Sequence, residues 1–163
     1  TFQMLTGGAQ LAKRVLSYPH PVIAACSGHA MAMGLFLLQC ADVRIGLNAG
    51  ATFQANEVLI GMTLPYFALE ALRERVATPH LHLVGTGLAY GGAAAVQAGL
   101  LDEAVAPEAL AAAVQAQVDR LKKAHPASFT ATKQRLRAGV LGALPAAIEK
   151  DKADWMRLGA AKA

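Results

Sequence analysis

The 163-residue sequence has little charge and few aromatic side chains: 16% of its residues are charged and 6% are aromatic. Together with 55% hydrophobic residues, this composition excludes a disordered chain and predicts one folded unit. There are only two cysteines, Cys26 and Cys40, and both lie in apolar stretches. We therefore expect two buried free thiols rather than a disulfide, as in a reducing compartment such as the cytoplasm.

Targeting and membrane signals are also missing. The N-terminus has no basic region followed by an apolar stretch, which excludes a recognisable secretory signal. The apolar stretch from 21 to 41 is long enough for a membrane span, but Pro21, Gly28 and Gly34 interrupt it. A buried strand, a turn and a buried helix fit it better, so we expect a cytoplasmic protein without a membrane partner. Because the sequence starts with Thr1 and not with methionine, we expect it to begin partway through a gene product.

Signatures of nucleic-acid, metal and dinucleotide binding are weak. Fifteen basic and eleven acidic residues give a net charge of +4, but basic residues form no run and do not alternate with aromatics, so we expect no nucleic-acid partner. His80 and His82 lie two apart without a cysteine or carboxylate at ligand spacing, so we expect no metal. The segment 85–91 has Tyr90 where a dinucleotide loop needs its third glycine, which favours a helix end with a turn.

The hydrophobic pattern predicts an α/β fold. A short apolar run at 22–26 and an alternating segment at 42–47 flank a strongly apolar helix at 34–41, and this order favours a parallel sheet. A further strand is expected at 100–105. Helices are expected at 6–17, from Pro65, from Thr78-Pro79, from Pro107 to Lys123, at 128–138 and at 144–158, the last two separated by Gly139 and Gly142 and anchored by Phe129, Leu136, Ile148, Trp155 and Leu158.

One candidate for chemistry is the turn from Gly28 to Gly34, between the first strand and the buried helix. Small residues there let backbone N–H groups approach a ligand, and the helix N-terminus adds positive potential, so the turn could hold an oxyanion. The alternative is that the small residues only permit tight packing. Ser27 and His29 do not form a hydrolase triad, because the Ser elbow motif and an orienting acid are both missing.

The second candidate is Glu57, an isolated carboxylate among apolar residues. If it is buried without a cationic partner, desolvation raises its pKa and makes it a competent proton shuttle near neutral pH. A partly exposed structural glutamate is the alternative.

Taken in order, these segments resemble the crotonase superfamily, the enoyl-CoA hydratase and isomerase group. The resemblance covers nearly the whole chain and rests on 21–25, the Ser27-Gly28-His29-Ala30 turn, Cys40-Ala41-Asp42, 53–57 with Gly61, Thr86-Gly87, Ala94-Ala95 and Gly99-Leu100. It implies a spiral of ββα units over residues 1–106, followed by a helical trimerisation region over 107–163.

The resemblance also implies roles for single residues. Met33 stands where a backbone N–H forms half of the oxyanion hole, with its side chain directed away from the acyl group. Hydratases use two glutamates; the first position holds Phe36 here, whereas Glu57 matches the second. Asn56-Glu57 with Gly61 and Pro65 resembles the Δ3,Δ2-enoyl-CoA isomerase branch. Further substrate-binding residues implied in this way are His29, Met31, Ala32, Gly34, Phe36, Asn56 and Pro65.

The resemblance therefore implies an acyl-CoA isomerase that moves a double bond from C3 to C2 through an enolate, with Glu57 as the only proton shuttle. Another crotonase reaction, such as hydration, and a non-catalytic acyl-CoA or protein binder are the alternatives. No cofactor is expected apart from the coenzyme A of the substrate, and the assembly is expected to be a homotrimer or hexamer. The second oxyanion donor is expected in an absent N-terminal portion, and Lys133, Arg135 and Arg137 are candidate phosphate neighbours.

Overall fold

A computed structural model describes residues 2–160 of the chain. Its central sheet has the order β1-β3-β5, with β1 (Ile23–Cys26) and β5 (Glu103–Val105) both parallel to β3 (Val43–Leu47). All five residues of β3 are buried, as expected for a strand covered on both faces. The α/β class and the parallel sheet are thereby confirmed.

A second, smaller sheet was not expected from the sequence. It pairs β2 (Ala30–Met31) in parallel with β4 (Phe53–Gln54). Strands of two residues are too short to show the alternation of polar and apolar residues by which a strand is recognised. This small sheet nevertheless determines where the candidate site forms.

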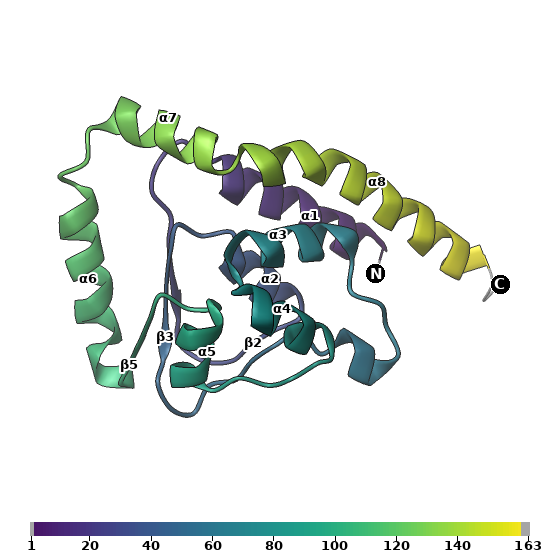
Figure 1. The fold of residues 1–163 in the computed structure, drawn as a ribbon, viewed down its shortest axis with the longest axis horizontal. Helices are drawn as coiled ribbons and strands as arrows, with labels where there is room; N and C mark the ends of the chain where they lie inside the picture. Colours follow the sequence, from purple (N-terminus) through teal and green to yellow (C-terminus); the bar gives the residue numbers. More distant parts are fainter. Residues whose placement is uncertain (1, 161–163) are drawn as a thin grey trace.

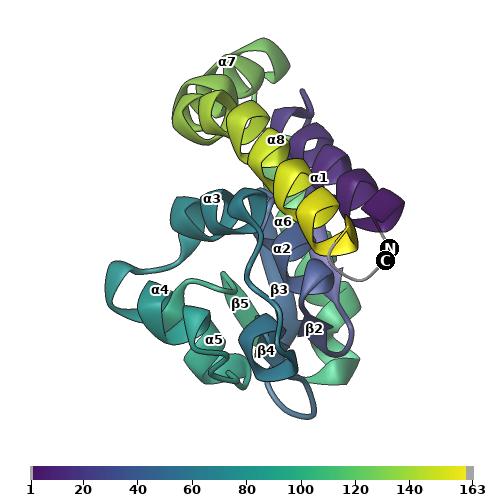
Figure 2. The same cartoon turned by 90° about the vertical axis from the view of Figure 1, so that its right-hand side faces the viewer.

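Helices pack around both sheets (Figures 1 and 2). Those of the first part of the chain are α1 (Phe2–Ser17), α2 (Met33–Gln39), α3 (Tyr66–Arg75), α4 (Thr78–Gly85) and α5 (Gly92–Ala98), with the 3-10 helix η1 (Glu57–Ile60) between β4 and α3. Helix α2 buries Leu35, Phe36, Leu38 and Gln39, which agrees with its apolar sequence. Pro65 and Ala77 are the N-caps of α3 and α4, so Pro65 and Thr78 each stand one helical position away from the predicted one.

The last part of the chain is helical, with the 3-10 turn η2 (Pro107–Ala109), α6 (Leu110–Leu121), α7 (Pro126–Leu136) and α8 (Ala138–Ala160). Helix α6 packs on β1 and β3, while α8 runs along α1 and α3 (Figures 1 and 2). None of the helices in the described part of the chain is long and apolar enough to cross a membrane.

The predicted boundary between the last two helices was wrong. Gly139 and Gly142 lie inside α8, and the break falls at Arg137. Tertiary packing overrides the low helix propensity of glycine here, because Val140 and Leu144 on the same helix are buried. Ile148 is a buried anchor as predicted, but Leu136 is 74% exposed. The Leu158 side chain lies outside the described residues.

Both cysteines are free thiols, as expected. Cys40 is buried, and burial raises the pKa of its thiol to about 12. Cys26 is only partly buried, at the end of β1.

Candidate active site

The β2–β4 ladder brings together the two segments that the sequence singled out. Met31 pairs with Gln54, and the Ala32 N–H donates to the Gln54 carbonyl at 3.0 Å. Because the strands are parallel, the chain leaves both at the same edge, toward Met33 in one segment and Glu57 in the other. The ends of parallel strands are the usual place for a ligand site.

The backbone before Met33 is held in an unusual conformation. Ala32 has φ 48° and ψ −123°, and it is the only non-glycine residue with positive φ in the described part of the chain. The first hydrogen bond of α2 runs from the Phe36 N–H to the Ala32 carbonyl at 3.1 Å. The amides of the first turn, beginning with Met33, therefore have no partner inside the helix and are open to an acceptor.

The side chain of Met33 lies against Gly8 of α1, in the space that a Cβ at position 8 would need. It is partly buried against the core. This contact directs the thioether toward α1 and leaves the backbone amide of Met33 at the start of α2.

Glu57 is 5% exposed, and its Oε2 is buried without a hydrogen-bond partner among the described residues. Burial raises the pKa of this carboxyl, and the hydrogen bond from its own backbone N–H only partly offsets the shift. The Oδ1 of the preceding Asn56 is also buried without a partner. A carboxyl group with a raised pKa thus stands at the start of η1 with one oxygen unpartnered, and such a group can accept and return a proton.

An aromatic pair joins α2 to α3. Phe36 is 1% exposed, and its ring meets that of Phe67 edge to face, with centroids 6.0 Å apart and an interplanar angle of 89°. Phe67 belongs to α3, whose N-cap Pro65 is buried. The position at which the resemblance places the first hydratase glutamate thus holds a packed apolar side chain.

The loop between α4 and α5 holds β4 in place, a role that the sequence did not indicate. Tyr90 and Phe53 exchange two backbone hydrogen bonds of 3.0 Å, and the Gln54 side chain donates to the Gly87 carbonyl at 2.7 Å. Gly87 has φ 83°, and the Leu59 side chain lies over it. The predicted turn at the end of α4 is confirmed, and it supports the strand that leads to Glu57.

The predicted site residues differ in exposure. His29, Met31 and Gly34 are exposed, while Phe36, Glu57 and Pro65 are buried. The exposed apolar residues Leu59 and Ile60 of η1 were not singled out from the sequence; they are 62% and 61% exposed. Both belong to the 3-10 helix that begins with Glu57, and we call these two residues its apolar rim.

Two of the candidate phosphate neighbours, Lys133 and Arg137, are committed to internal contacts. The Lys133 ammonium pairs with Asp42 at 2.6 Å, and the Arg137 guanidinium pairs with Asp42 at 2.9 Å and donates to the Cys40 carbonyl at 2.7 Å. Both cations are buried, so they cannot reach a phosphate. Arg135 is exposed, and its role stays a prediction.

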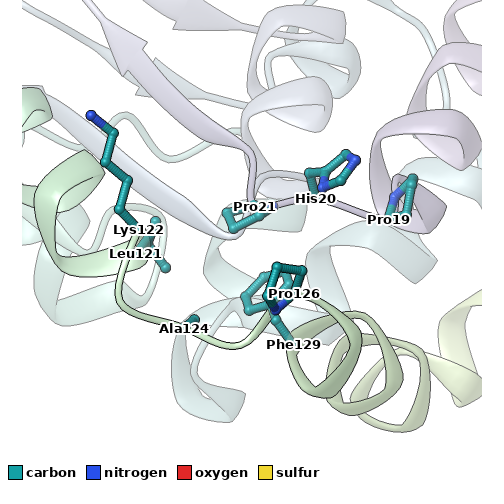
Figure 3. A pocket seen from close by; sticks show the side chains of 8 residues that line it. All are labelled: Pro19, His20, Pro21, Leu121, Lys122, Ala124, Pro126 and Phe129. Atoms are coloured by element: carbon teal, nitrogen blue, oxygen red, sulfur yellow. The ribbon is translucent and has the colours of Figure 1, made fainter.

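A cavity of about 140 Å³ lies elsewhere, where the segment before β1 meets the connection between α6 and α7 (Figure 3). Its lining includes His20, Leu121 and Phe129 and no residue of the Glu57 site. Within residues 2–160, no cluster of three or more His, Cys, Asp or Glu side chains could hold a metal ion.

Known proteins place this geometry in context. The family model described as enoyl-CoA hydratase/isomerase matches residues 4–161. A probable enoyl-CoA hydratase, echA17, of Mycobacterium avium is 37% identical over 95 residues, which are 58% of this chain and 37% of that protein. The peroxisomal enoyl-CoA delta isomerase 2 of Arabidopsis thaliana is 30% identical over 104 residues, 63% of this chain and 43% of that protein. The chain thus spans about two fifths of these relatives.

Solved structures agree on the fold and differ in name. An apo enoyl-CoA isomerase structure from Mtb has a TM-score of 0.89 and 41% identity, covering 93% of this chain and 67% of that one. A probable enoyl-CoA hydratase, ECHA3, from Mycobacterium tuberculosis H37Rv has a TM-score of 0.92 and 39% identity, covering 99% and 68%.

Proposed function

Because this chain belongs to the enoyl-CoA hydratase/isomerase family, we propose that it moves a double bond from C3 to C2 of an enoyl-CoA, with Glu57 as the only proton shuttle. The observation that carries the proposal is the Glu57 carboxylate, buried and without a partner at Oε2, together with Phe36 in place of a second glutamate. The confirmed family makes the enoyl-CoA thioester the substrate class of the proposal.

In the proposed reaction, Glu57 removes a proton from C2, and the electrons move through C1 to the thioester oxygen. The Met33 N–H donates to the enolate oxygen as it forms; removal of one such donor costs other enzymes about 3 to 4 kcal/mol of transition-state stabilisation. The enolate then collapses toward a C2–C3 double bond, and the proton held by Glu57 goes to C4. One base thus serves both steps, and no atom is gained or lost.

Phe36 favours this reaction over hydration. Adding water requires groups that activate the water and supply a proton, and a phenyl ring can do neither. The Phe36 and Phe67 rings are also buried and packed edge to face, so the Phe36 position is shielded from bulk water. The exposed apolar rim at Leu59 and Ile60 offers a surface suited to an acyl chain.

Hydration is the second candidate, because most of the similar curated proteins are described as probable hydratases. It assigns the same Glu57 carboxylate to the activation of water.

The test compares the purified wild-type protein with Glu57→Gln on 3-enoyl-CoA and 2-enoyl-CoA in parallel. We expect isomerisation of the 3-enoyl substrate to dominate, and the substitution to slow it by about 10² to 10⁴-fold, the usual contribution of a general base. Glu108→Gln, which changes an exposed glutamate of η2, is the control and should leave the rate unchanged. A 3-hydroxyacyl-CoA as the main product, or an unchanged rate in Glu57→Gln, contradicts the proposal.

A further inference from the structure

Helix α3 is capped by a residue of α8, far from it in the sequence. Asp151 of α8 is 2% exposed, and its carboxylate accepts hydrogen bonds from the Tyr66 N–H at 2.7 Å and the Phe67 N–H at 3.0 Å. A side chain just before the helix usually fills this role, but the N-cap of α3 is Pro65, which has no acceptor. The carboxylate also carries the charge that a helix N-terminus favours.

This cap holds the backbone of Phe67, whose ring packs on Phe36, the residue that we assign to the acyl site. Phe67, whose amide Asp151 holds, packs its ring edge to face on Phe36 with centroids 6.0 Å apart. Both rings are buried, so neither can move far without opening a void. The position of Phe67 depends on the first turn of α3, and that turn is fixed by Asp151.

Among the described residues, the neighbours of Asp151 give it no ion pair. Lys150 lies over the Tyr66 ring at 5.3 Å, and Asp154 pairs with Arg157 on the same helix. Burial raises the pKa of Asp151, and the two amide hydrogen bonds act against that shift. The two amides at the start of α3 are thus the partners that hold its charge.

We propose that Asp151 is a positioning residue of the acyl site: it fixes the start of α3, so that Phe67 holds Phe36 in place and water stays out. This inference rests on the proposed function. Asp151 touches no reacting atom in this proposal. It sets the ratio of isomerised to hydrated product through the two phenylalanine rings.

The first test measures amide hydrogen exchange at Tyr66 and Phe67 in the purified protein. Hydrogen bonds to a charged acceptor contribute about 1.5 to 3 kcal/mol, so Asp151→Ala should speed exchange at both amides by about tenfold or more. Asp151→Asn keeps one acceptor oxygen and should give an intermediate effect. Asp154→Asn, one turn away on α8, is the matched control and should leave both amides unchanged. Unchanged exchange in the Asp151 variants overturns the proposal.

The second test measures the product ratio from 3-enoyl-CoA. We expect Asp151→Ala to raise the hydrated fraction severalfold, Asp151→Asn to raise it less, and Asp154→Asn to leave it at the wild-type value. In a Phe36→Ala background the Asp151 substitution should add no further change, because both act through the pair of Phe36 and Phe67 rings. The proposal is contradicted if the effects of the Asp151 and Phe36 substitutions on the product ratio multiply fully. It is also contradicted if Asp151→Ala lowers the Tm and leaves the product ratio unchanged, because Asp151 then has a structural role only.

The two tests also separate this inference from the proposed function. If the wild-type protein isomerises no substrate, the proposed function fails. Exchange at Tyr66 and Phe67 then still decides whether Asp151 fixes the start of α3. If Asp151→Ala does not fold, Asp151→Asn supplies both measurements.

Discussion

Asp42 and Glu57 are acidic side chains withdrawn from solvent, and their surroundings differ completely. The Asp42 carboxylate pairs with Lys133 and Arg137 and accepts the Val22 N–H at 2.8 Å. Glu57 has a buried Oε2 without a partner in the described part of the chain. The Asp42 carboxylate, paired with two cations, ties the surrounding segments together. The Glu57 carboxylate has one buried oxygen without a partner, which costs stability, and burial raises its pKa.

The backbone near each acid shows the same difference. Beside Asp42, the Arg137 guanidinium donates to the carbonyls of Leu16 and Cys40. The C-terminal carbonyls of α1 and α2 therefore have a hydrogen-bond donor there. At the site, Ala32 adopts a positive φ, and Asn56 has a buried oxygen without a partner. Strain and missing partners thus gather in the region to which we assign the chemistry, as functional sites commonly show.

The largest expected change in stability comes from disrupting the ion pairs of Asp42 with Lys133 and Arg137. Arg137→Met removes one cation from Asp42 and leaves buried carbonyls without a donor, so we expect a loss of about 3 to 5 kcal/mol in the free energy of unfolding. Denaturant unfolding measures it. Arg135→Met, two residues earlier and exposed, is the control and should change stability by less than about 0.5 kcal/mol. If Arg137→Met and Arg135→Met changed the free energy of unfolding equally, the contacts of Arg137 with Asp42 and the carbonyls would not stabilise the fold.

The next effect has the opposite sign. Burial raises the pKa of Glu57 above the ordinary value of a glutamate, so the folded state binds its proton more tightly than the unfolded state. Stability is therefore lost as pH rises from the unfolded-state pKa of Glu57 to its folded-state pKa. Above the folded-state pKa, the full cost of burying the charged carboxylate is present. Glu57→Gln removes the cost, and we expect a gain of about 1 to 3 kcal/mol at pH 8 that vanishes near pH 4.

Thermal or denaturant unfolding at both pH values checks this gain. Glu108→Gln, on an exposed residue, should show no pH-dependent gain. A Glu57→Gln variant that is less stable than the wild type at pH 8 would show that Glu57 has a stabilising partner after all.

The smallest effect concerns the backbone at the oxyanion turn. Ala32→Gly relieves the positive φ, which stabilises the folded state by about 1 to 2 kcal/mol. It also gives the unfolded chain more freedom, which costs about 0.4 to 1 kcal/mol of stability. We expect the free energy of unfolding to rise by about 0.5 to 1 kcal/mol. Gly87→Ala, at φ 83° and under Leu59, should instead destabilise the protein. Calorimetry can resolve the two signs, and a loss in Ala32→Gly would mean that the turn is unstrained.

The sequence predicted the features that depend on local pattern. Strand β1 is a short apolar run after Pro21, β3 lies in a segment of alternating polar and apolar residues, and Glu57 is recognisable as a lone acid among apolar residues. The two-residue strands that bring Met33 and Glu57 to one edge carry no such pattern. The break at Arg137 also escaped prediction, because packing keeps Gly139 and Gly142 helical.

Long-range pairings could not be predicted either. Lys133 and Asp42 are separated by 91 residues, so no spacing rule links them. Of the three candidate phosphate neighbours on this helix, Lys133 and Arg137 are buried and Arg135 is exposed, a difference that their spacing alone does not show. The family is confirmed, whereas the preference for isomerisation and the trimeric or hexameric assembly stay predictions.

The most direct measurement follows a deuterium label from C2 of a 3-enoyl-CoA through the wild-type reaction. A solitary, shielded carboxyl should carry part of the label to C4 of the 2-enoyl product, because its proton exchanges slowly with solvent. Complete replacement of the label by solvent protons at C4, or a hydroxyl group at C3, would contradict the claim that Glu57 alone carries the proton.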